Sequence, residues 1–159
     1  MSADQARVSV ALSLPPADAF RIFTREIDQW WLSGLRFRAQ GAARSIVYLE
    51  ERAGGGLFER LGEQVVKTGV ITVWDPPSRV VFDWRGKNLV GEDKTEVEVT
   101  FVAQGDGTLV TLTHRGWTRI PSDHPVRHGK ADREFLRDLG LWWADLLTSL
   151  RMLAARKPE

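Results

Sequence analysis

Among the residues that could do chemistry, His114 has the clearest structural context. It follows Val110 and Leu112 at every second position of a strand-like segment, so we expect its side chain on the apolar face. A histidine there could hydrogen-bond a ligand, or act as an acid or base near neutral pH. The alternative, which we favour over catalysis, is a buried histidine bonded to the backbone or to a neighbouring carboxylate.

A second group of candidate ligating residues consists of Asp123, His124 and His128. Histidines four residues apart share one face of a helix and could bind a metal together with Asp123. Pro121 and Pro125 disfavour a regular helix, and no further ligand is evident, so we expect no metal. We expect the long connection that carries these residues to form a mobile lid over a pocket.

Other catalytic motifs are absent from the sequence. Gly54-Gly55-Gly56 is followed by neither the lysine and hydroxyl residue of a phosphate-binding loop nor a helical pattern. There is no Gly-x-Ser-x-Gly motif, and there is no cysteine, which excludes disulfides, thiol catalysis and cysteine-bound metals. We expect the charged residues that flank the glycines to be solvated.

The elements that position these residues are strands and one long helix. Alternating apolar and polar residues predict strands at 7–14, 44–51, 57–61, 65–74, 79–85, 95–103 and 108–115. Pro15-Pro16 ends the first strand and starts a short helix through Phe23, followed by another turn or two to Trp31. Because the strands alternate with polar residues, an antiparallel sheet is expected.

The final segment, Asp132 to Arg156, predicts a long helix with one wide apolar stripe. Steps of four and three give the stripe Leu136, Gly140, Trp143, Leu147 and Leu150. The glycine removes a side chain where helix and sheet should meet, which suggests room for a small apolar guest. The predicted fold is therefore α+β, one domain over residues 1–159, with a curved antiparallel sheet of six to seven strands wrapped around the last helix and two short helices after the first strand.

Seven tryptophans against one tyrosine is the unusual feature of the composition. Strand parity places Phe82, Trp84 and Phe101 toward the helix. Rigid rings pack less adaptably than aliphatic chains, so gaps between them favour a pocket. Whether Trp30 and Trp31 are buried or form an exposed patch is left open.

Charge and hydropathy exclude several classes of partner. The 22 basic and 21 acidic residues are well mixed and give a net charge of +1, so neither nucleic acid nor an anionic membrane is an expected partner. The longest apolar runs are too short to span a bilayer, and no signal-peptide pattern opens the chain. Cytoplasm is the expected location.

Several short motifs follow one another along the chain from about Arg7 to Leu153, and their order and spacing are informative. They are Pro15-Pro16-Ala17-Asp18-Ala19-Phe20, Trp30-Trp31, Gly55-Gly56-x-Phe58-Glu59, Gly69, the Trp74-x-Pro76-Pro77 turn with its strand to Trp84, Thr95-x-Val97-x-Val99-x-Phe101, the segment from Gly107 to Trp117, and Trp143-x-x-x-Leu147-x-x-Leu150. In these motifs the chain resembles the helix-grip superfamily known as SRPBCC or START-like. Within it, the chain is most similar to the family of heat-shock-protein-90 ATPase activator homologues.

The resemblance implies a helix-grip fold with a cavity between sheet and helix, and it places Glu59 at the cavity mouth; a surface ion pair is the alternative. Trp142 stands where the family commonly has glycine before the helix tryptophan, and Gly140 lies earlier, so the pocket should differ in shape here. Eukaryotic activators carry a separate chaperone-binding domain. We expect none here, and therefore no direct stimulation of a chaperone ATPase.

Together these patterns predict a non-catalytic protein that binds a small hydrophobic or amphipathic molecule without a cofactor or metal. The residues expected to line the site are Phe37, Phe58, Glu59, Phe82, Trp84, Phe101, Leu112, His114, Trp117, Leu139, Gly140, Trp143 and Leu147. One alternative is a cyclase- or dehydratase-like enzyme, which would need two ionisable groups facing inward close together. The other is a stress-related co-chaperone or protein-interaction module with an exposed apolar patch, to which Trp30 and Trp31 could contribute.

Overall fold

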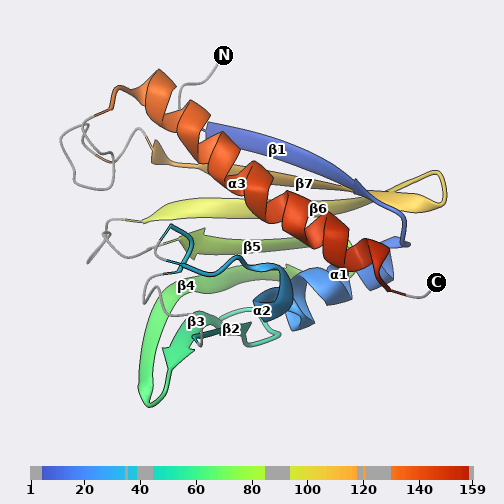
Figure 1. Cartoon of the computed structure of the whole chain (residues 1–159), viewed down its shortest axis with the longest axis horizontal. Helices are drawn as coiled ribbons and strands as arrows, with labels where there is room; N and C mark the ends of the chain where they lie inside the picture. Colours follow the sequence, from blue (N-terminus) through green and yellow to red (C-terminus); the bar gives the residue numbers. More distant parts are fainter. Residues whose placement is uncertain are drawn as a thin grey trace.

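The computed structural model describes residues 5–34, 36–38, 45–84, 94–117, 120 and 130–157. Within these ranges, one antiparallel sheet of seven strands has the order β1-β7-β6-β5-β4-β3-β2, and α3 lies across its face (Figure 1). The predicted helix-grip architecture is confirmed. The elements are β1 (Gln5–Leu12), α1 (Pro16–Arg25), α2 (Ile27–Trp30), β2 (Ile46–Leu49), β3 (Gly56–Leu61), β4 (Gln64–Asp75), β5 (Arg79–Trp84), β6 (Thr95–Gln104), β7 (Gly107–Arg115) and α3 (Asp132–Ala155).

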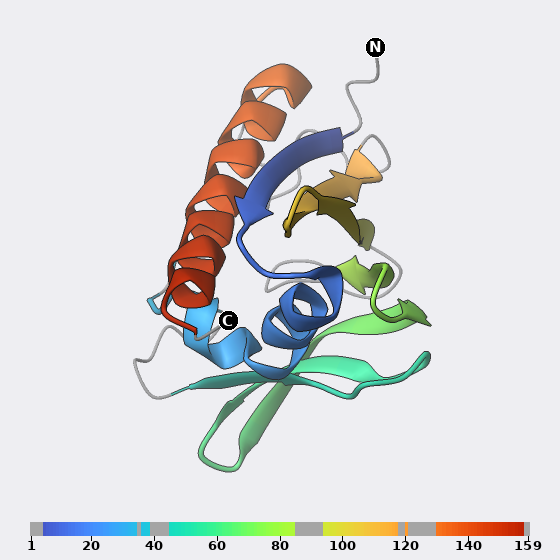
Figure 2. The same ribbon diagram turned by 90° about the vertical axis from the view of Figure 1, so that its right-hand side faces the viewer.

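Local sequence explains where the first elements begin and end. β1 ends two residues earlier than predicted because the chain bends at Ser13 and Leu14. Pro15 is extended and Pro16 takes the first position of α1, where its missing N–H has no cost. The next helix, α2, is a single turn, as Figure 2 shows beside α1.

The sheet curls strongly, so that α1 lies inside its concave face and α3 covers the open side of the same concave face (Figure 2). Two register shifts accompany the curl, one between Leu57 and Phe58 in β3 and one between Ile71 and Val73 in β4. At Gly69 the backbone of β5 approaches closely: a Cβ there would lie 2.2 Å from the carbonyl oxygen of Asp83. Only glycine fits this position.

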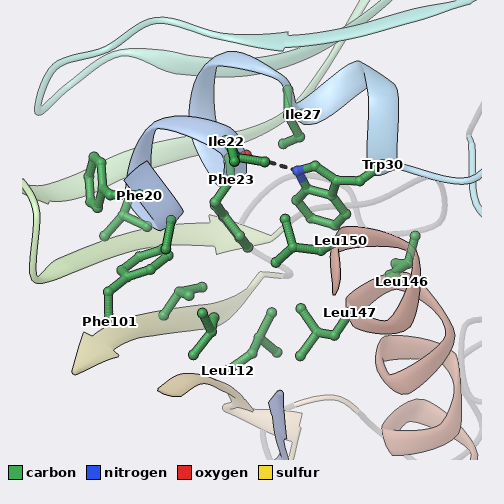
Figure 3. Close-up of a cluster of buried hydrophobic side chains, with 14 of the residues drawn as sticks. Phe20, Ile22, Phe23, Ile27, Trp30, Phe101, Leu112, Leu146, Leu147 and Leu150 are labelled. Carbon is green, nitrogen blue, oxygen red and sulfur yellow. Dashed lines mark hydrogen bonds between the residues drawn. The ribbon is translucent and has the colours of Figure 1, made fainter. Parts of the chain in front are cut away.

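The half of the core around α1 is densely packed (Figure 3). Phe101 of β6 meets Phe20 and Phe23 of α1 edge-on, with ring centroids 5.0 and 5.5 Å apart. The same cluster includes Ile22, Ile27, Trp30, Leu112, Leu146, Leu147 and Leu150, all buried.

The structure answers the question left open about the two early tryptophans. Trp30 is 0% exposed and donates its indole N–H to the carbonyl of Phe23 (3.1 Å), and Trp31 is 5% exposed. Neither one therefore contributes to an exposed apolar patch. None of the helices in the described ranges combines the length and apolar character needed to cross a membrane.

The close approach at Gly69 leads to a first prediction. Gly69→Ala should lower the free energy of unfolding by about 2 kcal/mol, because the methyl group forces β4 and β5 apart. Urea unfolding followed by tryptophan fluorescence would measure it. The matched control is Gly140→Ala in α3, where the methyl meets nothing within 4 Å and should stabilise the helix by about 1 kcal/mol. Equal urea midpoints for Gly69→Ala and the wild type would contradict the close approach.

Candidate functional site

Four tryptophan rings meet between the sheet and the middle of α3. They are Trp31 after α2, Trp84 at the end of β5, and Trp142 and Trp143 of α3. Ring centroids in every pair lie between 4.9 and 6.1 Å apart. Trp31 and Trp143 are buried, whereas Trp84 and Trp142 are half-buried. The cluster therefore forms a rigid wall that is solvent-accessible on one side.

His114 lies beneath this wall and both of its ring nitrogens are bonded. The indole N–H of Trp143 donates to Nδ1 (3.0 Å), and Nε2 lies 2.6 Å from the hydroxyl oxygen of Thr95. Since Nδ1 accepts, Nε2 carries the proton and donates to Thr95, whose hydroxyl can in turn donate to the carbonyl of Trp84 (3.4 Å). The chain of bonds runs from α3 through β7 and β6 to β5.

Burial lowers the pKa of His114 from its ordinary value of 6.5 to about 3. The imidazole is therefore neutral at physiological pH. Its partners are an indole and a hydroxyl group, and not the backbone or carboxylate that the sequence suggested. With both nitrogens engaged, His114 has no free position for a ligand or for proton transfer.

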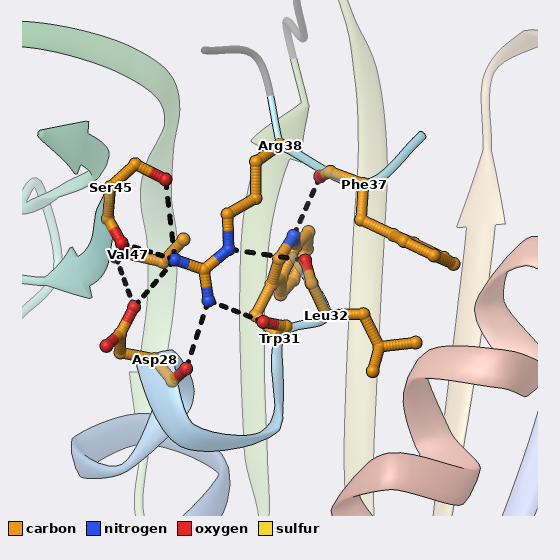
Figure 4. Close-up of polar contacts among 7 residues, drawn as sticks. All are labelled: Asp28, Trp31, Leu32, Phe37, Arg38, Ser45 and Val47. Carbon is orange, nitrogen blue, oxygen red and sulfur yellow. Dashed lines mark hydrogen bonds and ion pairs between the residues drawn. The ribbon is translucent and has the colours of Figure 1, made fainter. Parts of the chain in front are cut away.

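Arg38 ties the segment after α2 to its surroundings (Figure 4). Its buried guanidinium donates to the carbonyl oxygens of Leu32, Ser45, Asp28 and Trp31, and it pairs with the Asp28 carboxylate at 2.9 Å. A planar group with five donors suits such a set of converging acceptors. Arg38 is therefore a positioning residue, and nothing in the sequence pattern indicated this role.

The segment that Arg38 holds packs against α3. Trp31 donates its indole N–H to the carbonyl of Phe37 (2.9 Å), and the Phe37 ring stacks on Trp142 with centroids 5.6 Å apart. Trp142 in turn donates to the carbonyl of Arg36 (2.7 Å), whose side chain pairs with Asp145 at 2.9 Å. The early segment and the last helix thus build the wall together.

Gly140 lies in α3 close to the wall, and its surroundings are open. The glycine is partly exposed at the edge of the buried stripe of α3, and a Cβ on it would meet nothing within 4 Å. Its neighbour Leu139 packs, like Trp84, against two separate clusters, the main core and a smaller one of Trp117, Ile120, Phe135 and Leu136. Gly140 therefore follows directly after a residue at which the two clusters adjoin.

A sequence model of the family described as "Activator of Hsp90 ATPase homolog 1-like protein" matches residues 13–139, which is most of the chain. The chain belongs to this family. Among curated proteins, none matches the sequence.

Solved structures share the fold of this family member at low identity, which by itself shows the fold alone. MLL2253 from Mesorhizobium loti has a TM-score of 0.67 at 15% identity, over 98% of this chain and 99% of that one. PFC0360w, an HSP90 activator from Plasmodium falciparum, has a TM-score of 0.66 at 18% identity, over 96% of each chain. The Aha1 dimer from Colwellia psychrerythraea has a TM-score of 0.63 at 16% identity, over 92% of each chain.

In this member of the Hsp90-activator-homologue family, about half of the residues expected at the site come together. Those at the aromatic end are Phe37, Trp84, His114, Trp117, Leu139, Gly140 and Trp143. Four others are buried in the main core: Phe82, Phe101, Leu112 and Leu147. The sequence did not single out Trp31 and Trp142 for the site, although both were visible as aromatic neighbours of predicted positions.

Phe58 and Glu59 lie apart from this group. Leu57 of β3 takes the core side, so Phe58 points to the opposite face, where it stacks on Tyr48 at 5.2 Å. Glu59 is buried in β3 opposite Val47 and Val66.

The residues that the sequence offered as metal ligands cannot be placed. Asp123, His124 and His128, with the connection expected to act as a lid, lie outside the described residues. Within the described ranges, no three His, Asp or Glu side chains lie close enough to hold a metal. An open groove of about 510 Å³, which the sequence did not predict, lies between α1 and the end of β4 with the turn that follows it. It is lined by Ala17, Phe20, Arg21, Thr24, Arg25, Glu51, Trp74, Pro76 and Pro77.

The buried histidine predicts a specific pH dependence. Its pKa is about 3 when folded and near 6.5 when unfolded, so below pH 6.5 only the unfolded chain takes up the proton. Stability is therefore complete above pH 6.5 and is lost as the pH falls toward 3. Between pH 7 and pH 5 the free energy of unfolding should fall by about 2 kcal/mol, measured by urea unfolding.

His114→Gln is the control, because the amide keeps a donor and an acceptor but does not titrate. The free energy of unfolding of this variant should be nearly the same at pH 7 and at pH 5. Glu98, whose pKa is lowered by hydrogen bonds from Arg115 and Arg79, loses its contribution only below about pH 4.5. A wild-type stability that stays constant from pH 7 to pH 5 would mean that the folded protein protonates His114.

Arg38 gives a second prediction for this site. Arg38→Lys should lower the free energy of unfolding by about 3 kcal/mol, because one ammonium group cannot serve the converging acceptors. The matched control is the exposed Arg36, two residues away. Arg36→Lys should change the free energy of unfolding by less than about 1 kcal/mol. Acrylamide quenching should also rise for Arg38→Lys as Trp31 becomes exposed. Similar quenching and stability in the two variants would show that Arg38 does not position Trp31.

Proposed function

We propose that this protein binds a small apolar or amphipathic molecule, without chemical change, between the sheet and the N-terminal half of α3. The observation that carries the proposal is Gly140, at the partly exposed edge of the buried stripe of the helix, where a Cβ would meet nothing within 4 Å. A helix that packs on a sheet normally carries a side chain at the edge of its apolar stripe. Here the half-buried Trp84, Leu139 and Trp142 are available to contact a guest instead.

The two ends of the interlayer space support this location. Around α1 the core residues are almost fully buried (Figure 3), and the groove beside that helix is open and lined in part by the charged Arg21, Arg25 and Glu51, which suits an apolar guest less well. At the aromatic end, rings held by Trp31, His114 and Arg38 cannot collapse into the space without breaking hydrogen bonds. A preformed wall of this kind favours ligand binding, because little ordering is required on association.

The chemistry of the lining supports binding over catalysis. A cyclase- or dehydratase-like mechanism needs inward ionisable groups near neutral pKa values. His114 is neutral, with its pKa lowered to about 3, and both of its nitrogens bond to protein partners. The ligand would therefore be held by apolar contacts and left chemically unchanged.

A protein partner is the second candidate function. Ile46 of β2 and Val65 of β4 are 39% and 49% exposed, and both pair with Arg60 of β3, so the three share one face. The stacked Tyr48 and Phe58 form the next row of that face. An exposed apolar row with a cation suits an acidic or apolar partner, and the family resemblance to HSP90 activators such as PFC0360w gives this candidate its support.

Filling the space with a side chain tests the ligand proposal. Native mass spectrometry of gently purified wild-type protein should show a discrete small-molecule adduct, and titration should show binding of an apolar probe such as 2-ethylnaphthalene. Gly140→Leu should remove the adduct and weaken probe binding about tenfold or more, since the leucine occupies the guest's place. It should also unfold at a higher urea concentration, because leucine favours the helix over glycine.

The matched control is Thr148→Leu, which places the same leucine side chain on the exposed face of the same helix. It should leave both adduct and probe affinity unchanged. If Gly140→Leu binds the probe as tightly as the wild type, the site lies elsewhere. A wild-type protein that carries no adduct and binds no probe would favour the protein partner.

A further inference from the structure

Within the described part of the chain, one buried side-chain nitrogen has no hydrogen-bond partner: Nε1 of Trp117. The side chain is 2% exposed. Buried polar groups in proteins are nearly always bonded, and leaving a donor unpaired is costly. The exception therefore needs a physical explanation.

The other inner indoles show what is unusual about Trp117. The indole N–H groups of Trp30, Trp31, Trp142 and Trp143 each donate to an acceptor, at 3.1, 2.9, 2.7 and 3.0 Å. In three of these the acceptor is a backbone carbonyl, and in the fourth it is a histidine nitrogen. The described residues thus supply an acceptor for each of these four rings and none for Trp117.

The neighbouring ring of His114 cannot serve as the acceptor. The Trp117 ring lies 4.9 Å from the His114 ring, between centroids. Nδ1 of His114 accepts from Trp143, and Nε2 donates to Thr95, so neither nitrogen can accept from Trp117. On its other side Trp117 meets the Phe135 ring at 4.7 Å, which offers no oxygen or nitrogen.

Trp117 also packs against the part of α3 that leads to Gly140. It forms one cluster with Phe135 and Leu136 of α3, and Trp84 and Leu139 pack against both this cluster and the main core. Leu139 directly precedes Gly140 in the helix. An indole donor with no acceptor among the described residues therefore lies against the segment of α3 that precedes Gly140, where the proposed ligand would bind.

We propose that Trp117 is the polar anchor of this site and that its N–H donates to a neutral acceptor on the ligand, such as a ketone, ester or ether oxygen. This inference rests on the proposed function and refines it, because it names the ligand class as an apolar molecule that carries one neutral oxygen acceptor. A carboxylate fits less well, since the surrounding cluster is apolar and would desolvate a charge.

A ligand oxygen bonded to Trp117 should contribute more to affinity than an ordinary hydrogen bond does, because the N–H group has no partner in the free protein. An ordinary protein hydrogen bond replaces one with water, so its net contribution is small. The Trp117 N–H has lost its water without gaining an acceptor, so a ligand oxygen that reaches it recovers this loss. Because the nitrogen is buried, neighbouring side chains must shift as the ligand enters. We expect the oxygen to raise affinity about tenfold over the hydrocarbon of equal shape.

A pair of probes of nearly equal shape tests this inference. 2-Acetylnaphthalene carries a carbonyl group where 2-ethylnaphthalene carries a methylene group. Wild-type protein should bind the ketone about tenfold more tightly, and Trp117→Phe should bind both equally, since it keeps an aromatic ring and loses the donor. Trp74→Phe is the matched control, because Trp74 packs on Phe20 at the other end of the core, and it should keep the preference for the ketone.

A second measurement works on the wild type alone. In a ¹H–¹⁵N spectrum of the seven indole groups, assigned through the backbone, the Trp117 proton should move downfield with the ketone and stay in place with the hydrocarbon. If both probes bind equally well and the Trp117 proton does not respond, the anchor is overturned while the pocket at Gly140 stands. If neither probe binds, the proposed ligand function fails together with its anchor.

Discussion

The position of the C-terminal helix depends on one neutral histidine. His114 accepts a hydrogen bond from Trp143 of α3 and donates one to Thr95 of β6, so helix and sheet are joined through a single buried ring. Protonation would turn the accepting nitrogen into a donor that faces another donor, which is why the bond and the charge exclude each other. Gly140 lies three residues before Trp143 in the same helix, so the bond also contributes to the placement of this partly exposed glycine.

The space between α3 and the sheet is divided between two kinds of packing. Around α1, leucine and isoleucine side chains pack with phenylalanine and Trp30 (Figure 3), because aliphatic chains choose rotamers that fill irregular volumes. At the other end, flat indole rings meet at fixed angles, and the N–H groups of Trp31, Trp142 and Trp143 are tied to carbonyl oxygens or to His114. Rings restrained in this way cannot rotate to close a gap, so an opening beside them persists.

Much of the fold followed from sequence periodicity, whereas the site followed only in part. Alternation gave all seven strands and the four-and-three stripe gave α3, because each pattern reports a local repeat against one buried face. Strand parity could also have placed Phe58 away from the core, since its neighbour Leu57 faces inward. The contacts of Arg38 with Asp28 and Ser45 depend on how loops meet in space, and no local repeat encodes them.

Hydrogen-bond satisfaction separates structural polar groups from functional ones in this protein. His114 is the side chain that the sequence first indicated for chemistry and Arg38 is one that it did not indicate, yet both are buried, bond extensively to protein atoms and hold the wall in place. Trp117 was expected at the site only as an aromatic wall, yet among the described residues its side chain buries a donor without a partner. Stability explains the presence of His114 and Arg38, because removing either one would leave its buried partners unpaired. Stability does not explain Trp117, since a phenylalanine would fill a similar volume without burying an unpaired N–H group.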